Sequence, residues 1–215
     1  MDRNKRNSFN EIKEKLSKKL VGWKEKLLSK VGKEVLIKAI GQAIPMYTIS
    51  CFKIPDSLCG ELISMIRNFW WDQKQDERKM VRLYWDKLCA PKVAEGMGFH
   101  QLKQFNLTLL AKQGWRLQTM QDSLLYHPFK ARYFPHSDFL QALIGNNPSY
   151  AWQSIMAAQF LVQQGIHWNV GNGASIRVWG DKWLPFTSMY KVVSPRQFLH
   201  ADTRVSELIS QDSIC

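Results

Sequence analysis

The feature that most constrains the fold is a stripe of apolar residues near the N-terminus. Between residues 10 and 31, apolar side chains recur at steps of three and four: Ile12, Leu16, Leu20, Trp23, Leu27 and Val31. This spacing follows the turn of an α-helix and puts all of them on one face. We therefore expect a helix over 10–31 with one buried and one basic face. Gly32 is suited to end it as a C-cap.

Helical spacing continues along most of the chain. A second helix is expected from about residue 33, and it should end or kink near Pro45, because proline interrupts a helix. Pro55 and Asp56 suit the first turn of a third helix. Phe69 and Trp70 belong to the C-terminal end of its expected buried face. Later helices are predicted over 103–120, 122–133 and 149–164.

The C-terminal part changes from helical spacing to alternation. The segments 166–170 and 175–179 alternate apolar and polar residues, and Gly171-Asn172-Gly173 between them is typical of a turn. This pattern predicts a small β-hairpin. The expected fold class is mainly α, with a helical bundle, a helical connector and a small C-terminal β-hairpin. Four parts are expected along the chain. They are a basic helical region at 1–75, a connecting segment at 76–100, a helical connector at 101–165, and the β-hairpin with the C-terminal tail at 166–215.

The chain is strongly basic, and its charge is uneven. It carries 30 Lys and Arg against 18 Asp and Glu, a formal net charge of +12. Residues 1–40 hold twelve basic and five acidic residues, a net of +7, so the rest of the chain adds +5. Such a balance indicates a polyanionic partner, nucleic acid first and an acidic membrane surface second. The alternative is an ordinary solvated helix face.

The candidate nucleic-acid contacts are lysines of the basic region and two residues beyond them. Lysine and arginine bind phosphate without regard to base sequence. Trp71 is the tryptophan best placed to stack on a base, because Phe69 and Trp70 already point inward. Arg177, on the expected hairpin, could face a phosphate or be a solvated strand residue. The lysines expected to contact phosphate are Lys13, Lys18, Lys24, Lys26, Lys30, Lys33 and Lys38.

The sequence contains no recognisable catalytic or metal-binding constellation. Its four cysteines have no CxxC spacing and no matching histidine pair, so we expect reduced thiols and no metal. The adjacent acids Asp76-Glu77 lie in a polar run, which is typical of solvated surface. No cofactor and no catalytic residue are expected. No apolar run reaches the roughly 18 residues of a membrane span. With nucleic acid ranked first for the basic charge, we expect no membrane among the partners.

Several short motifs, weak one by one, are specific when taken in order from about Lys15 to Pro185. They include Gly22-Trp23-Lys24, Leu36-Ile37-Lys38, Phe69-Trp70-Trp71, Trp85-Asp86-Lys87-Leu88-Cys89, Gly96-Met97-Gly98-Phe99, Leu110-Ala111-Lys112-Gln113-Gly114-Trp115, Val170-Gly171-Asn172-Gly173 and Asp181-Lys182-Trp183-Leu184-Pro185. In this order the chain resembles the region downstream of the polymerase core in plant LINE-type (non-LTR) retrotransposon reverse transcriptases. It is also similar to short plant mitochondrial reverse-transcriptase-like open reading frames.

The resemblance implies a place within a larger enzyme. Residues of about 10–75 would be the helical thumb, which grips the template–primer duplex through its backbone, and the later residues a connector. The family's polymerase site uses a Tyr-x-Asp-Asp run, and this sequence contains none. The resemblance therefore implies a non-catalytic fragment with weak, sequence-independent affinity for an RNA–DNA hybrid or duplex. Glu95 stands where the family usually has a second glycine.

Other interpretations remain open at this point. The chain could be a helical interaction module, with a protein partner on its basic helix or on an apolar thumb face that the missing polymerase core leaves uncovered. It could also be one exon of a longer enzyme, or a relic without function. Nuclear and mitochondrial locations are both compatible with the sequence.

Overall fold

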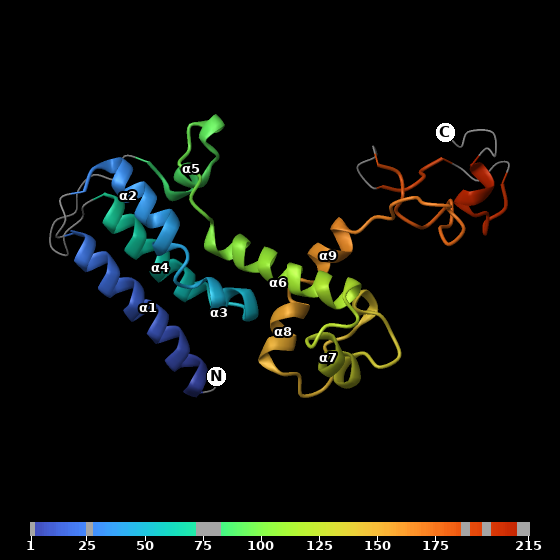
Figure 1. Cartoon of the computed structure of the whole chain (residues 1–215), viewed down its shortest axis with the longest axis horizontal. Coiled ribbons are helices and arrows are strands. Elements are labelled where there is room, and N and C mark those ends of the chain that lie inside the picture. The colour runs from blue at the N-terminus through green and yellow to red at the C-terminus, as the bar shows by residue number, and fades with distance from the viewer. Residues whose placement is uncertain (1–2, 25–27, 72–82, 186–189, 195–198, 210–215) are drawn as a thin grey trace. The chain divides into compact units, whose positions relative to one another are not determined.

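In the computed structural model the chain is mainly helical, which confirms the predicted class, and it divides into two compact units (Figure 1). The first unit is Met1–Val162 and the second is Gln163–Cys215. The residues that the structure describes are 3–24, 28–71, 83–185, 190–194 and 199–209.

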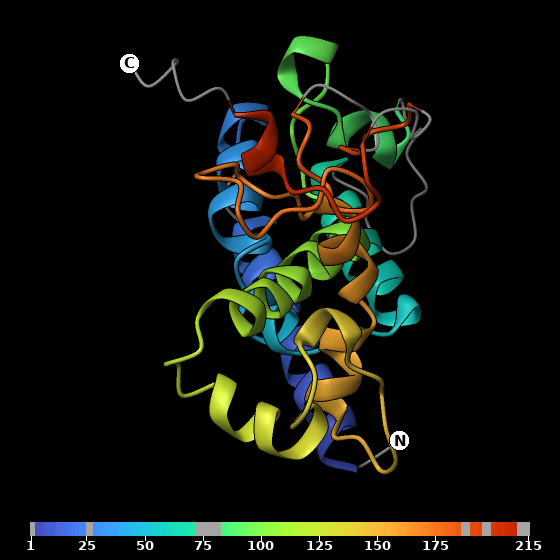
Figure 2. The same cartoon turned by 90° about the vertical axis from the view of Figure 1, so that its right-hand side faces the viewer.

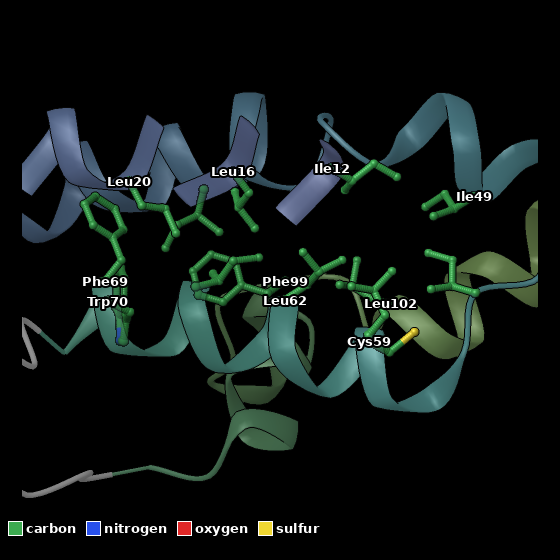
Figure 3. Packing of buried hydrophobic residues seen from close by; sticks show 14 of the residues in the cluster. Ile12, Leu16, Leu20, Ile49, Cys59, Leu62, Phe69, Trp70, Phe99 and Leu102 are labelled. Carbon is green, nitrogen blue, oxygen red and sulfur yellow. The ribbon is translucent and has the colours of Figure 1, made fainter. Parts of the chain in front are cut away.

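The first unit is built on the pairing of two long helices, α1 (Arg3–Lys24) and α4 (Asp56–Trp70). Figure 3 shows Leu16 and Leu20 of α1 pointing toward the apolar side chains of α4. Leu16 and Leu62 are completely buried in this cluster. Burial of each such side chain stabilises the fold by about 1.5–3 kcal/mol. Ile12, Leu16, Leu20 and Trp23 of the predicted stripe are confirmed as the inner face of α1. Val31 is not part of it, because it lies in the next helix and is 70% exposed, and Leu27 lies outside the described residues.

The predicted end of that first helix is wrong. α1 is described only to Lys24, and a separate helix, α2 (Lys30–Leu36), begins at the N-cap residue Ser29. The Ser29 Oγ accepts a hydrogen bond from the backbone N–H of Gly32 at 3.2 Å. A serine side chain satisfies the otherwise unpaired N–H groups of a first helical turn. Gly32 thus lies in the first turn of α2 and does not cap α1.

The expected interruption near Pro45 is confirmed. α2 runs into a π-helical turn, η1 (Ile37–Gly41), and Pro45 is the N-cap of the short helix α3 (Met46–Cys51). Proline is tolerated there because its missing N–H has no helical partner in any case. The chain then turns through Phe52 and enters α4 after Pro55.

The helix α6 (Leu102–Thr119) contacts α3, α4 and α8 (Tyr150–Met156), and Figure 2 shows α8 beside α6. Its C-terminal half joins a second apolar cluster around Trp152, which is fully buried. The Trp152 ring stacks on Tyr133 with centroids 4.7 Å apart. The remaining described helical elements are short: α5 (Trp85–Cys89), η2 (Lys92–Ala94), α7 (Tyr126–Tyr133), η3 (Phe139–Gln141), α9 (Gln159–Gly165) and η4 (Val205–Leu208).

The predicted C-terminal β-hairpin is wrong. In the described part of the second unit, 175–179 does not pair with 166–170; Arg177 instead pairs with Arg204 in one antiparallel bridge. Gly173, with a φ of +68°, lies against this later segment, and its carbonyl accepts the N–H of Ser206 at 3.1 Å. A Cβ at Gly173 would lie 2.6 Å from the Ser206 nitrogen, so only glycine fits there.

Candidate nucleic-acid interface

The outer face of α1 carries a row of exposed lysines. Its apolar face is buried against α4, so the charged residues between the apolar positions must face solvent. Three of the predicted contacts, Lys13, Lys18 and Lys24, lie exposed on this helix. Lys15 and Lys19 share that exposure and were not among the predicted contacts. Counting every off-stripe lysine from 13 to 24 would have found them.

Two of these lysines form surface ion pairs. Lys13 Nζ lies 2.6 Å from Glu61 on α4, and Lys15 Nζ lies 2.6 Å from Glu11 one turn earlier. The hydrogen bond from Lys15 lowers the pKa of the Glu11 carboxyl below its usual value of 4.5. Exposed pairs of this kind contribute about 0–1 kcal/mol and exchange readily with other anions. Lys18 and Lys19 have no carboxylate partner among the described residues.

The predicted lysines of α2 lie against the end of α4. Lys30 Nζ donates a hydrogen bond to the Trp70 carbonyl at 2.7 Å and lies 4.9 Å from the centre of the Trp70 ring. Lys33 is only 5% exposed, and its ammonium lies 5.7 Å from the Phe69 ring. An ammonium is attracted to the carbonyl end of a helix and to an aromatic face. The ammonium groups of both lysines therefore contact aromatic and carbonyl groups of this chain.

Lys38 forms an ion pair with the largely buried carboxylate of Glu34. Its Nζ lies 2.7 Å from Glu34, and Lys92, which the sequence did not single out, reaches the same carboxylate at 3.0 Å. Hydrogen bonds from the two ammonium groups lower the pKa of Glu34 below its ordinary value. One carboxylate facing two lysines leaves a local excess of one positive charge.

Trp71 is half-buried and is part of an aromatic group. Its ring meets Trp70 edge to face at 6.4 Å, and Lys30 Nζ lies 5.1 Å from its centre. Trp71 also packs against the main apolar cluster, which limits the ring surface left for a base. The predicted contact Lys26 lies outside the described residues. Arg177 is exposed in the second unit, 3.4 Å from Asp181.

A cleft of about 420 Å³ opens where the α3–α4 turn meets α6 and α8. Lys53 and Lys103 line it, together with Asp56, Tyr150 and Gln153. The Lys103 ammonium lies 2.8 Å from Asp56, and Lys53 has no ion pair within the described part of the chain. The elements that form this cleft are far apart in sequence, so no sequence pattern points to it.

Metal ligands do not gather anywhere in the described residues: no group of three or more His, Cys, Asp or Glu could hold an ion. Cys51, Cys59 and Cys89 are all free thiols. Burial raises the pKa of the Cys89 thiol to about 11, which makes it unreactive at neutral pH. In the same part of the chain, every helix is too short or too polar to cross a bilayer.

Comparison with known proteins identifies two relatives, both from Arabidopsis thaliana. The "Uncharacterized mitochondrial protein AtMg00310" is 39% identical over 143 residues, which are 66% of this chain and 93% of that protein. The "Putative ribonuclease H protein At1g65750" is 29% identical over 205 residues, which are 94% of this chain. This chain spans 33% of the length of that second relative. No protein-family model matches the chain, and no solved structure matches it.

Proposed function

This chain belongs to the family of the Arabidopsis thaliana mitochondrial protein AtMg00310, and from that premise we propose that it is a retroelement-derived, non-catalytic nucleic-acid-binding protein. Its ligand is the phosphate backbone of a duplex, with an RNA–DNA hybrid as the first candidate. The surface that binds it is the lysine face of α1. Binding through phosphates is independent of base sequence.

The retroelement origin is supported by two independent observations. The ordered motifs from Lys15 to Pro185 resemble the segment that follows the polymerase core in LINE-type reverse transcriptases. The second relative, a longer protein, is named for ribonuclease H, an activity that acts on RNA–DNA hybrids. We assign no catalytic step to this chain, because its sequence contains no Tyr-x-Asp-Asp run.

One observation carries the binding proposal: Lys15, Lys18 and Lys19 occupy successive positions of a single exposed helix face. Lys18 and Lys19 lie three and four residues after Lys15, spacings at which Cβ atoms on a helix surface are about 5–6 Å apart, so the three lysines form one cationic patch. The opposite face of α1 is buried on α4, which holds the patch on a rigid element. Lys18 and Lys19 have no carboxylate partner in the described part of the chain, so a phosphate displaces no ion pair there.

The decisive experiment measures binding of the full chain to a fluorescent RNA–DNA hybrid over a range of salt concentrations. The variant replaces Lys15, Lys18 and Lys19 with glutamine. The control replaces the exposed lysines Lys53, Lys87 and Lys112 with glutamine, which removes the same charge elsewhere. Each lost phosphate contact lowers the slope of log affinity against log salt by about 0.7–0.9.

We expect the α1 variant to lose about two to three units of this slope and the control to lose less than one. Equal losses in both variants would show that binding depends on net charge alone. Absence of binding at low salt, or binding that salt does not weaken, would reject the proposed function.

A protein-binding role is a second candidate, and one observation favours it. Val31 and Val35 lie one turn apart on α2 and are 70% and 57% exposed. Apolar residues at this spacing form a stripe that a helical partner covers in many complexes. Sedimentation of the full chain and of a Val31→Ser/Val35→Ser variant tests this candidate. A larger species that forms with the unchanged protein but not with the variant would support this role. A monomer for both proteins would argue against it.

A further inference from the structure

Two arginines of the second unit lie directly opposite each other in a short antiparallel pairing. The N–H of Val178 donates to the Thr203 carbonyl at 3.0 Å, and the N–H of Val205 donates to the Ile176 carbonyl at 2.8 Å. These two bonds flank Arg177 and Arg204, which form the bridge between them. Flanking bonds of this kind define a non-hydrogen-bonded pair, the type in which facing side chains come closest.

Alternation along both segments sends the two arginines to the same side. Ile176, Val178 and Val205 are only 2–3% exposed and form the small apolar cluster of this unit. Because successive residues of an extended segment point to opposite faces, Arg177 and Arg204 must point away from that cluster. Both are exposed, Arg177 with 53% of its side chain.

Two like charges directly opposite each other destabilise a pairing. The nearby carboxylates offset this repulsion unevenly: Arg177 forms an ion pair with Asp181, whereas Arg204 forms none within the described residues. Asp181 accepts the N–H of Arg177 at 2.9 Å and the Arg177 Nη2 at 3.4 Å. Glu207 accepts the N–H of Arg204 at 2.8 Å. One further bond joins Arg204 Nη1 to the Ser175 carbonyl at 3.3 Å.

Most hydrogen-bond donors of the two guanidinium groups therefore stay available. Each guanidinium carries roughly five N–H donors in a planar fork that matches the oxygens of a phosphate. Among the described residues, one side-chain hydrogen bond engages each group: Arg177 bonds to Asp181, and Arg204 bonds to the Ser175 carbonyl. Two forks on one face, brought together by a rigid pairing, fit a single anion with several acceptor oxygens.

We propose that Arg177 and Arg204 jointly bind one phosphate group. The ligand is either a phosphate of a nucleic-acid backbone or free inorganic phosphate, which share this chemistry. Only the first source rests on the proposed function. The site belongs to the second unit, whereas the lysine patch belongs to the first, so the two sites use separate sets of residues.

Nuclear magnetic resonance of the full chain tests this site through the Nε–Hε signals of its arginines. The signals of Arg177 and Arg204 are assigned with the variants Arg177→Lys and Arg204→Lys. Inorganic phosphate is titrated at constant ionic strength against a chloride reference, and an RNA–DNA hybrid is titrated separately. The backbone amide signals of Val178 and Val205 report whether each variant keeps the pairing intact.

We expect phosphate, and not chloride, to shift both signals with one shared midpoint. Replacement of Arg204 by lysine should raise the midpoint at Arg177 by about fivefold or more, because lysine keeps the charge but loses the fork. An unchanged midpoint at Arg177, or equal shifts with chloride, would overturn the proposal.

The hybrid titration separates the two sources of phosphate. Shifts of both signals by the hybrid support a nucleic-acid backbone as the ligand. If only inorganic phosphate shifts the two signals, the two-arginine site is supported, and the proposal that its ligand is a nucleic-acid phosphate is rejected. A chain that binds no hybrid anywhere rejects the proposed function, while phosphate-induced shifts in that chain still support the site.

Discussion

The Asn106 Oδ1 accepts the backbone N–H of Ile54 at 3.0 Å, which links the N-terminal part of α6 to the turn between α3 and α4. The same amide group donates from Nδ2 to the Ile49 carbonyl at 2.6 Å and to the Phe52 carbonyl at 2.9 Å. Asn106 is only 2% exposed. A single buried side chain thus satisfies three backbone groups of the α3–α4 turn that no helix can pair.

Replacement of Asn106 by leucine should destabilise the protein by about 3 kcal/mol, because buried backbone groups without partners cost roughly 1–3 kcal/mol each. Urea unfolding followed by circular dichroism measures the change. Gln104→Leu, an exposed position on the same helix, is the matched control and should change stability by less than about 0.5 kcal/mol. Similar losses at both positions would contradict a special role for Asn106.

Gly60→Ala should stabilise the protein by about 0.5–1 kcal/mol. Gly60 lies inside α4, and an added Cβ there would meet no atom within 4 Å. Glycine in a helix is unfavourable relative to alanine because it loses more backbone freedom on folding. Thermal unfolding should show a higher Tm, and a lower one would mean that this part of α4 is not helical in solution.

Gly114→Ala should have the opposite effect, although Gly114 also lies inside a helix. An added Cβ would lie 2.8 Å from the Phe139 ring and 3.4 Å from Val162. Overpacking of a filled site costs about 1–3 kcal/mol, which exceeds the gain in helix propensity. The Phe139→Leu background tests the cause, because removing the ring should reduce the penalty of Gly114→Ala. A penalty that persists unchanged would point elsewhere.

The ion cluster around Glu34 should make part of the stability dependent on pH. Hydrogen bonds from Lys38 and Lys92 hold the pKa of Glu34 below its ordinary value of 4.5 in the folded state. A lowered folded-state pKa contributes stability that is present above 4.5 and is lost as the pH falls through the folded pKa. Glu34→Gln should therefore be less stable than the wild type at neutral pH.

This difference should shrink toward zero as the pH falls below 4.5 and through the lowered folded-state pKa of Glu34, because the wild-type carboxylate then becomes protonated too. Urea unfolding of both proteins between neutral and acidic pH measures it. Glu14→Gln, at an exposed position of α1, serves as the surface control and should change stability at neutral pH by less than about 0.5 kcal/mol. A difference between wild type and Glu34→Gln that stays constant with pH would refute the electrostatic explanation.

The long helices were predictable because the information for a helix is local. The spacing of Leu58, Leu62, Ile66 and Phe69 marks the buried face of α4, and Pro55 marks its start. α6 was predicted over 103–120 and is observed over Leu102–Thr119. In both cases the hydrogen bonds join residues four apart, so the pattern of a short window is sufficient.

The surface chemistry was predictable only in part. Charge and periodicity placed Lys18 and Lys24 on the outer face of α1, where the structure has them. The same reasoning treated Lys30 and Lys33 as phosphate contacts, and the structure turns them onto Trp70 and Phe69. A long flexible side chain takes the partner that folding brings near it, and that partner lies about forty residues away in sequence.

By itself, then, the sequence determined the helical class, most of the buried faces of α1 and α4, the extent of α6, and the concentration of positive charge at the N-terminus. Tertiary structure alone decided that Ile176–Val178 pairs with Thr203–Val205, against the local hairpin pattern, and that Asn106 holds the α3–α4 turn. The physical reason is the separation along the chain between the residues that interact. Helical periodicity is set by neighbours along the chain, whereas strand pairing and buried hydrogen bonds depend on which distant segments meet.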